Sequence, residues 1–424
     1  MSHAWKGLPR SSAVIALASA MWAIAAPACA ETGITDGEVV IGASGALSGP
    51  NAGYGAVTLG AKACFDYLNA EQSGVKFGDG KTRKIRLDVV DDAMEPARAL
   101  QNARRLVSQN KVFAVLGNVG TGANLGARAF YNAEKVPQMF IGSGGPMFGA
   151  KDEVEKYPWT MLGWLSYNTE AAIYAAFIKE KFPNAKIALL NDDSGGPFFA
   201  DAFVKSAKQL GLDIVVHEEH TYSEPTINAK ISRLAASGAD LFVDATTPKF
   251  VVQALKQMAA IDWKPVHIIW GVGSSIGGVL EPAGASTSKG VYSGQWMKDY
   301  TNPAYANDDD MKLFATKIKQ YNSSLNPADQ NAAAGWYTCH AAKSLFERMT
   351  EPTRAAFMDA ARSMKNQKVP LLLDGITLNT SGVADGYPIE SVQISQFDGT
   401  KFVPVGSVID YEGKTPAYEP RVKP

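Results

Sequence analysis

Residues 85–116 read IRLDVVDDAMEPARALQNARRLVSQNKVFAVL, and this stretch decides the fold class. The run from Ile85 to Val90 is short and rich in β-branched residues, which predicts a strand. Residues 96–108 repeat their apolar side chains at helical spacing, and residues 112–116 predict a second strand. A strand, a helix and a strand in this order form a βαβ unit, in which a right-handed crossover joins two parallel strands.

The same alternation continues on both sides of this unit, in two series separated by a Gly-, Pro- and Trp-rich stretch at residues 145–164. The first series has strands predicted at 39–42, 85–90, 112–116 and 139–141 and helices at 54–69, 96–108 and 122–133. The second has helices at 169–180, 199–210, 226–236 and 250–260 and strands at 187–190, 214–216, 241–243 and 268–270. Later helices are predicted at 311–321, 332–349 and 354–363, before a β-rich end at 376–378, 392–397 and 402–405. This pattern predicts an α/β protein with two doubly wound parallel-sheet lobes.

The breaks in the pattern predict where the chain passes between the lobes. Lobe one is expected at residues 37–157 plus 290–366, and lobe two at 158–289 plus 367–424, with hinges at the junctions. Two such lobes bind ligands in the crevice at the carboxyl ends of their strands.

Residues 1–30 have the pattern of a secretory signal peptide. Lys6 and Arg10 precede an apolar run at 13–26, and Ala28-Cys29-Ala30 predicts cleavage before Glu31 and export to the periplasm. A membrane anchor is an alternative, but the apolar run is shorter than the ~20 residues that a spanning helix needs. A lipoprotein anchored at Cys29 is another, but the Leu typical of that motif is missing.

Composition excludes some classes of protein. The 424 residues include 41 Lys and Arg against 42 Asp and Glu, so the basic surplus of a nucleic-acid binder is absent. The other two of the three cysteines are Cys64 and Cys339, both in helices assigned to lobe one. A disulfide between them is geometrically possible in an oxidising compartment; two buried free thiols are the alternative.

No motif requires a catalyst. Residues 117–122, GNVGTG, follow a strand and open a helix, but the next strand ends without the acid that a dinucleotide loop needs. The N–H groups there favour an anion site, with a ligand carboxylate or carbonyl on Thr121. His217 and His220 would lie on opposite faces of a solvated strand end, which argues against a metal. No nucleophile–base set is present, and no cofactor is expected.

Several stretches resemble the leucine/isoleucine/valine-binding family of bacterial periplasmic transport proteins. They are residues 39–50, 54–55, 87–92, 112–126, 185–193 and 238–243, and the resemblance runs from about Gly37 to the end. The family implies a type I periplasmic-binding fold, with two lobes joined by a three-stranded hinge. It also implies closure on a ligand, delivery to a membrane ABC permease and no catalytic activity. We expect a monomer whose partners are a small-molecule ligand and that permease.

The resemblance also implies ligand contacts. The family's first loop matches Ser48 to Tyr54, and its carboxylate-binding Ser or Thr matches Thr121. Its second-lobe ammonium partners, a Tyr and a Glu, match Thr246 and Gly273, so Asp244 or Asp193 would have to replace them. We therefore expect a small solute that carries a carboxylate or an amide, with aromatic compounds among the candidates, rather than leucine. Independently of the resemblance, rings gather in the irregular segments, several just after a strand, where they would surround the apolar part of a ligand. The full set of expected contacts is Ser48, Tyr54, Gly120, Thr121, Gly122, Ser143, Gly144, Trp164, Tyr167, Phe198, Thr246, Trp270 and Gly273.

Other functions fit parts of this pattern. A ligand-sensing module for a histidine kinase or chemoreceptor would use the same fold, and neighbouring permease or kinase genes would separate import from sensing. An exported α/β enzyme would need the missing nucleophile–base set, and a repressor would carry a helix-turn-helix where the signal peptide stands.

Overall fold

The computed structural model describes residues 1–4, 7, 31–382 and 384–420. The chain forms two units, residues 1–30 and residues 31–424, and the second unit contains the fold. Most of the predicted signal peptide, including its cleavage site, therefore lies outside the described residues. Among the described helices, none combines the length and apolar character needed to cross a membrane.

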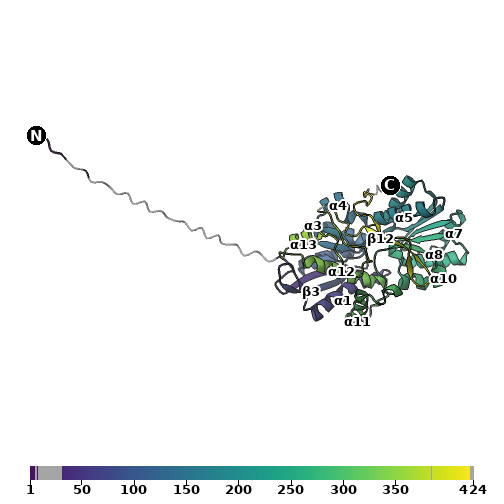
Figure 1. The fold of residues 1–424 in the computed structure, drawn as a ribbon, viewed down its shortest axis with the longest axis horizontal. Coiled ribbons are helices and arrows are strands. Elements are labelled where there is room, and N and C mark those ends of the chain that lie inside the picture. The colour runs from purple at the N-terminus through teal and green to yellow at the C-terminus, as the bar shows by residue number, and fades with distance from the viewer. Residues whose placement is uncertain (5–6, 8–30, 383, 421–424) are drawn as a thin grey trace. The chain divides into compact units, whose positions relative to one another are not determined.

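The first sheet contains the four strands of the first predicted series together with β2 and β6, which were not predicted (Figure 1). Strands β1, β3, β4, β5 and β6 pair in parallel, and β2 pairs antiparallel with β3. The order across this sheet is β2 (Val75–Lys76), β3 (Thr82–Asp91), β1 (Glu38–Gly45), β4 (Ala114–Leu116), β5 (Gln138–Ile141) and β6 (Thr160–Leu162). The βαβ prediction is thereby confirmed.

The helices of this lobe include three that come from late in the chain. They are α1 (Gly55–Glu71), α2 (Pro96–Ser108), α3 (Thr121–Ala133), α4 (Lys151–Lys156), α11 (Asp309–Tyr321), α12 (Gln330–Phe346) and α13 (Arg354–Ala361). Helices α1 and α12 approach so closely that a Cβ atom on Gly335 would lie 2.1 Å from the Val57 carbonyl oxygen. The Cys64–Cys339 disulfide, with its Cα atoms 6.2 Å apart, joins these two helices. The possible disulfide is thus confirmed, and both cysteines are fully buried.

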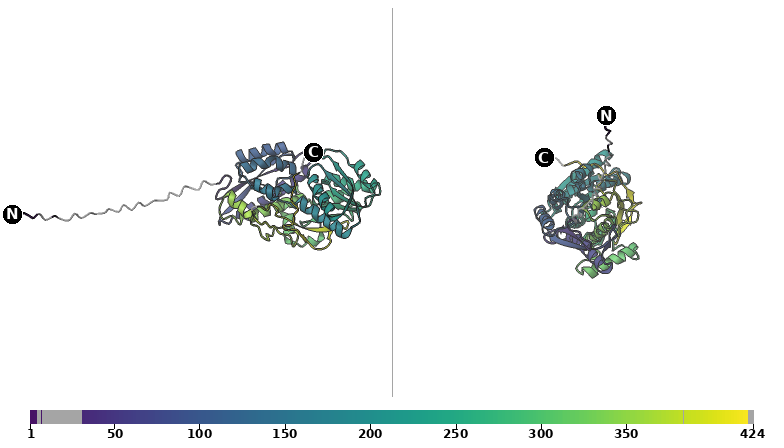
Figure 2. Two further views of the ribbon diagram at one scale, coloured as in Figure 1. Left: turned by 90° about the horizontal axis from the view of Figure 1, so that it is seen from above. Right: turned by 90° about the vertical axis from the view of Figure 1, so that its left-hand side faces the viewer.

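The second sheet is parallel in its centre and antiparallel at one edge. Its order is β13 (Phe402–Pro404), β12 (Ser391–Phe397), β11 (Tyr292–Gln295), β10 (Val266–Ile269), β9 (Leu241–Ala245), β7 (Lys186–Asp192) and β8 (Asp213–His220); β14 (Ile409–Asp410) pairs with β12. Its helices are α5 (Tyr167–Lys181), α6 (Gly196–Leu210), α7 (Asn228–Ala236), α8 (Pro248–Ala260), α9 (Glu281–Ala283) and α10 (Ala285–Ser288). Figure 2 shows the same arrangement from two further directions. The β-rich end completes this sheet, although residues 376–378 form only one bridge, Leu378 with Gln367.

The chain passes between the sheets after β6, after β11 and before β12. Strand β6 pairs with β5 in the first sheet, and β11 pairs with β10 in the second, so the first two passages lie beyond the expected boundaries at 157 and 289. The third lies beyond 366, because the Gly386 N–H still bonds the Gly149 carbonyl of lobe one. Strands of three or four residues inside Gly- and Trp-rich sequence carry too little alternation to be recognised.

Candidate functional site

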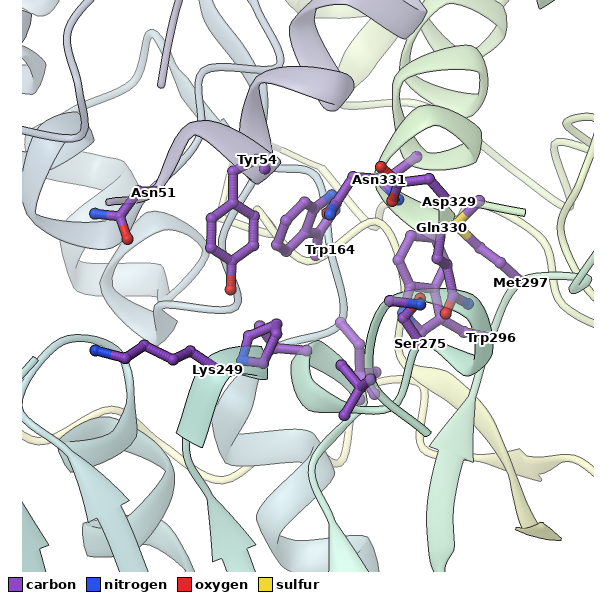
Figure 3. A pocket seen from close by; sticks show the side chains of 18 of the residues that line it. Asn51, Tyr54, Trp164, Lys249, Ser275, Trp296, Met297, Asp329, Gln330 and Asn331 are labelled. Carbon is purple, nitrogen blue, oxygen red and sulfur yellow. Dashed lines mark hydrogen bonds between the residues drawn. The ribbon is translucent and has the colours of Figure 1, made fainter. Parts of the chain in front are cut away.

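A cavity of about 290 Å³ lies in the crevice between the two lobes. Its first-lobe wall comes from residues 50–54 after β1, from Trp164 after β6 and from the start of α12. The second-lobe wall comes from segments that follow β8, β9 and β10. Figure 3 shows Tyr54 and Trp164 on one side, with Lys249 and Ser275 facing them. The carboxyl ends of strands from both sheets therefore shape this cavity, as the sequence predicts.

Aromatic rings form much of the cavity wall. Tyr54, Trp164, Tyr167, Tyr222 and Trp296 all line it. Burial, followed by the electrostatic effect of Tyr222 and Tyr167, raises the pKa of Tyr54 well above its ordinary value, so its phenol stays neutral. The Trp164 indole N–H has no hydrogen-bond acceptor among the described residues. Rings of this kind supply large contact areas at a small cost in conformational entropy.

Glu170 places a buried carboxylate at this cavity. Glu170 lies in the first turn of α5, lines the cavity and is 3% exposed to solvent. Its Oε1 atom accepts hydrogen bonds from the Tyr174 hydroxyl at 2.7 Å and from the Gly271 N–H at 2.6 Å. Burial raises the pKa of Glu170 to about 7, although both hydrogen bonds act to lower it.

Two further charged side chains line the cavity. Asp329 caps α12, where its Oδ1 accepts the Asn331 N–H at 2.9 Å, and burial raises its pKa. Lys249 is exposed at the start of α8. The cavity thus combines rings with two carboxylates and one exposed ammonium group.

Three of the predicted ligand contacts, Tyr54, Trp164 and Tyr167, line the cavity. The predicted anion site at Thr121 does not. Thr121 is 4% exposed, and its hydroxyl bonds the Ser143 hydroxyl at 2.8 Å, while Ser143 Oγ also accepts the Gly145 N–H. A Cβ atom on Gly144 would lie 2.4 Å from the Tyr167 ring. The protein's own groups fill this place, so Thr121, Ser143 and Gly144 do not line the cavity, nor do the neighbouring Gly120 and Gly122.

The remaining predicted contacts also lie outside the cavity lining. Trp270 is 1% exposed; its indole N–H donates to the Thr246 carbonyl at 2.6 Å, and its ring lies 5.0 Å from that of Tyr167. It therefore supports Tyr167 from behind. Gly273 is buried against Val251. Ser48 hydrogen-bonds Asp91.

Phe198 lines a second cavity of about 340 Å³, beside Pro146 and the C-terminal residues 416–419. Phe198 follows β7 closely in the chain but lies in α6, outside the lining of the first cavity, so this predicted contact does not reach it. Phe198 lies in the first turn of α6, near Gly195, where a Cβ atom would lie 2.9 Å from the Tyr167 hydroxyl.

Neither proposed replacement for the ammonium partners reaches the cavity. Asp244 Oδ1 accepts from the Thr246 N–H and hydroxyl, and Oδ2 lies 3.4 Å from His267 Nε2. Asp193 accepts the Tyr222 N–H at 2.7 Å. Sequence reasoning missed Glu170 instead. Its signal was available, because Glu170 is the one charged residue in the run 167–178.

The motifs set aside in the sequence have structural partners. His217 Nε2 lies 2.6 Å from Asn191 Oδ1, whereas His220 is buried, so the predicted solvated strand end is wrong at His220. The acidic run 308–310 caps a helix, because Asp308 accepts the Met311 N–H at 2.9 Å at the start of α11.

One acidic cluster has the composition of a cation site. Asp385, Glu390 and Glu412 place ligand atoms within 4.8 Å of one another. Both Glu390 oxygens already accept hydrogen bonds, from Thr415 and from the Gly413 N–H. Nothing else at this cluster points to a bound ion.

Comparison with known proteins identifies relatives across most of the fold. A family model described as periplasmic binding protein matches residues 38–401. An amino acid binding protein of Pseudomonas aeruginosa is 30% identical over 207 residues, which are 48% of this chain and 52% of that protein. Leu/Ile/Val-binding protein homolog 1 of Brucella abortus is 24% identical over 233 residues, 54% of this chain and 56% of the relative. The chain thus spans about half the length of the curated relatives it matches.

Solved structures share the fold at low sequence identity. A branched chain amino acid ABC transporter protein from Thermus thermophilus with bound valine superposes with a TM-score of 0.73 at 19% identity, covering 88% of this chain and 97% of the other. A solute binding protein from R. palustris in complex with 4-hydroxybenzoate gives a TM-score of 0.71 at 16% identity, with the same coverages. At these identities the comparison establishes the two-lobed fold and leaves the ligand open.

Proposed function

Because this chain belongs to the periplasmic binding protein family, we propose that it captures a small organic solute between its lobes and delivers it to an ABC importer. The family places the protein outside the cytoplasm. The observation that carries the proposal is the cavity itself, because segments after strands of both sheets line it. A ligand that contacts both walls stabilises the closed arrangement of the lobes.

The cavity wall supports a small solute with an apolar part. Tyr54, Trp164 and Tyr167 bring aromatic rings to the lining, each with a single polar atom. Proteins of this fold bind valine and 4-hydroxybenzoate, which are both small carboxylate-bearing molecules. We propose a small polar or carboxylate-bearing solute, with aromatic compounds and amino acids as the first classes to test.

Export and delivery complete the proposal. Residues 1–30 would direct the chain across the inner membrane, with cleavage before Glu31. The mature protein would act as a monomer, bind without turnover and present its closed form to a membrane permease. No nucleic acid takes part.

A thermal-shift screen of amino acids, small carboxylates and amides tests solute capture. A ligand that binds only the native state raises the melting temperature by mass action. Compounds that raise it are then titrated by calorimetry and recovered by chromatography, where we expect them unchanged. A screen without any binder, or a compound converted during incubation, would contradict the proposal.

A matched pair of variants locates the binding. Trp164→Phe changes a ring at the cavity, whereas Trp159→Phe changes a half-buried ring that packs against the core elsewhere. We expect the first to weaken binding and the second to leave it unchanged. Uptake of the labelled ligand by cells with and without the gene then tests delivery. Unchanged uptake together with intact binding would favour a sensing role over import.

A further inference from the structure

We propose that Glu170 recognises the solute through a cationic nitrogen, so that the preferred ligand carries a protonated amine. This inference rests on the proposed solute-binding function and specifies its ligand chemistry. The carboxylate comes from the first turn of α5, away from the two positions, Thr246 and Gly273, that the sequence matched to ammonium partners.

One oxygen of the Glu170 carboxylate is committed to the protein and the other is open. Oε1 accepts from both the Tyr174 hydroxyl and the Gly271 N–H. A glycine at 271 suits this close approach, because a Cβ atom there would make a tight contact with Oε1 at 3.3 Å. Oε2 has no hydrogen-bond donor within reach among the described residues. A buried carboxylate that faces a cavity in this way has one acceptor available for a ligand donor.

Glu170 also lacks a cationic partner within the described part of the chain. Lys249, the cation of the cavity lining, is exposed; its Nζ contacts the Glu224 carbonyl at 3.4 Å and lies 4.7 Å from the Phe250 ring. A buried carboxylate without a counter-charge is costly, and one that pairs with a cation is stabilised. A ligand ammonium would supply that missing charge.

The rest of the cavity favours a cation over an anion. The faces of Tyr54, Trp164 and Trp296 offer the electron-rich surfaces that attract ammonium groups, and Asp329 adds a second carboxylate. The Trp164 indole N–H, which has no acceptor among the described residues, and the exposed Lys249 ammonium are donors of this lining, but an anion there would face the carboxylates of Glu170 and Asp329. The hydroxyls of Thr121 and Ser143, the expected anion donors, bond each other outside the cavity lining.

The test compares compounds that differ only in their charged groups. One set is phenylalanine, 2-phenylethylamine and 3-phenylpropanoate; a second is leucine, 3-methylbutylamine and 4-methylpentanoate. Calorimetry and thermal shift are carried out with the purified wild-type protein, and further sets are built in the same way on any compound that binds in the screen. We expect amine-bearing members to bind and the matched acid without an amine to bind at least about tenfold more weakly.

A variant pair assigns the effect to Glu170. Glu170→Gln removes the charge and is expected to weaken amine binding about ten- to hundredfold. Glu180→Gln makes the same change on the same helix at an exposed side chain, and should leave binding unaltered. The melting temperature of each unliganded variant confirms that it folds.

The outcomes separate this inference from the proposed function. Tight binding of acids without an amine, or equal amine affinity in Glu170→Gln and wild type, would overturn the role of Glu170 and leave solute capture standing. If no compound of the screen binds the wild-type protein, solute capture and this inference both fail.

Discussion

Replacing Glu170 by Gln is expected to stabilise the unliganded protein at alkaline pH, in addition to weakening ligand binding. In the folded protein, burial raises the pKa of Glu170 from 4.5 to about 7. The native state therefore binds this proton more tightly than the unfolded chain does. Between these two pKa values the native state holds more protons, so stability falls as the pH rises through this window.

The magnitude follows from the pKa values. At about 1.4 kcal/mol for each pH unit between 4.5 and about 7, ionised Glu170 costs about 3 kcal/mol of unfolding free energy at pH 8. Gln stays neutral and retains an oxygen for the Gly271 N–H and the Tyr174 hydroxyl. The variant should gain up to about 3 kcal/mol at pH 8 and less than about 1 kcal/mol at pH 5.

Urea unfolding followed by tryptophan fluorescence measures this difference at pH 5, 6, 7 and 8. Tyr174 and Tyr167, which interact with Glu170, have pKa values raised above their ordinary values and do not titrate in this range. Other groups that titrate, such as Asp192 and His340, are shared by both proteins. Glu180→Gln is the control and should show no pH-dependent gain. A gain that is equal at all four pH values, or a loss at pH 8, would refute the reasoning.

Three further predictions concern stability. Replacing both Cys64 and Cys339 by Ser opens a loop closed across 275 residues and should cost up to about 5 kcal/mol, read as a lower urea midpoint that reducing agent no longer changes. Asp308→Ala removes the cap of α11 and the 2.6 Å ion pair with the buried Lys298, so we expect a loss of about 2 kcal/mol, whereas Asp309→Ala in the same turn serves as control. Gly335→Ala forces a Cβ atom against backbone and should cost about 3 kcal/mol or prevent folding; a melting temperature equal to wild type would show that α1 and α12 lie farther apart.

Local patterns predicted most elements because each pattern is stabilised by residues close in sequence. Helix α2 spans Pro96–Ser108 as predicted, since proline starts the helix and the apolar spacing continues through it. Strands β6 and β11 escaped prediction, because three or four residues cannot establish a period of two. They belong to their sheets through pairing with β5 and β10, which is a long-range interaction.

The crevice was predictable, and so was a role in it for rings of the irregular segments such as Tyr54 and Trp164. The start of α12 was not, because it reaches the cavity from 275 residues beyond Tyr54 in the chain, at Asp329. Nor could the sequence show that the Thr121 hydroxyl hydrogen-bonds the Ser143 hydroxyl instead of a ligand, since both residue types suit an anion site equally well.

By itself, the sequence determined the two α/β series, the crevice at their strand ends and the family, because periodicity and motif order are properties of neighbouring residues. Only the tertiary structure decided which polar groups remain available to a ligand. A hydroxyl or carboxylate bonds whatever the fold brings within about 3 Å, and that partner can come from anywhere in the chain. Thr121 bonds Ser143 and does not line the cavity. Glu170 does line it, and the hydrogen bond from the Gly271 N–H, 101 residues away, holds its carboxylate at the cavity wall.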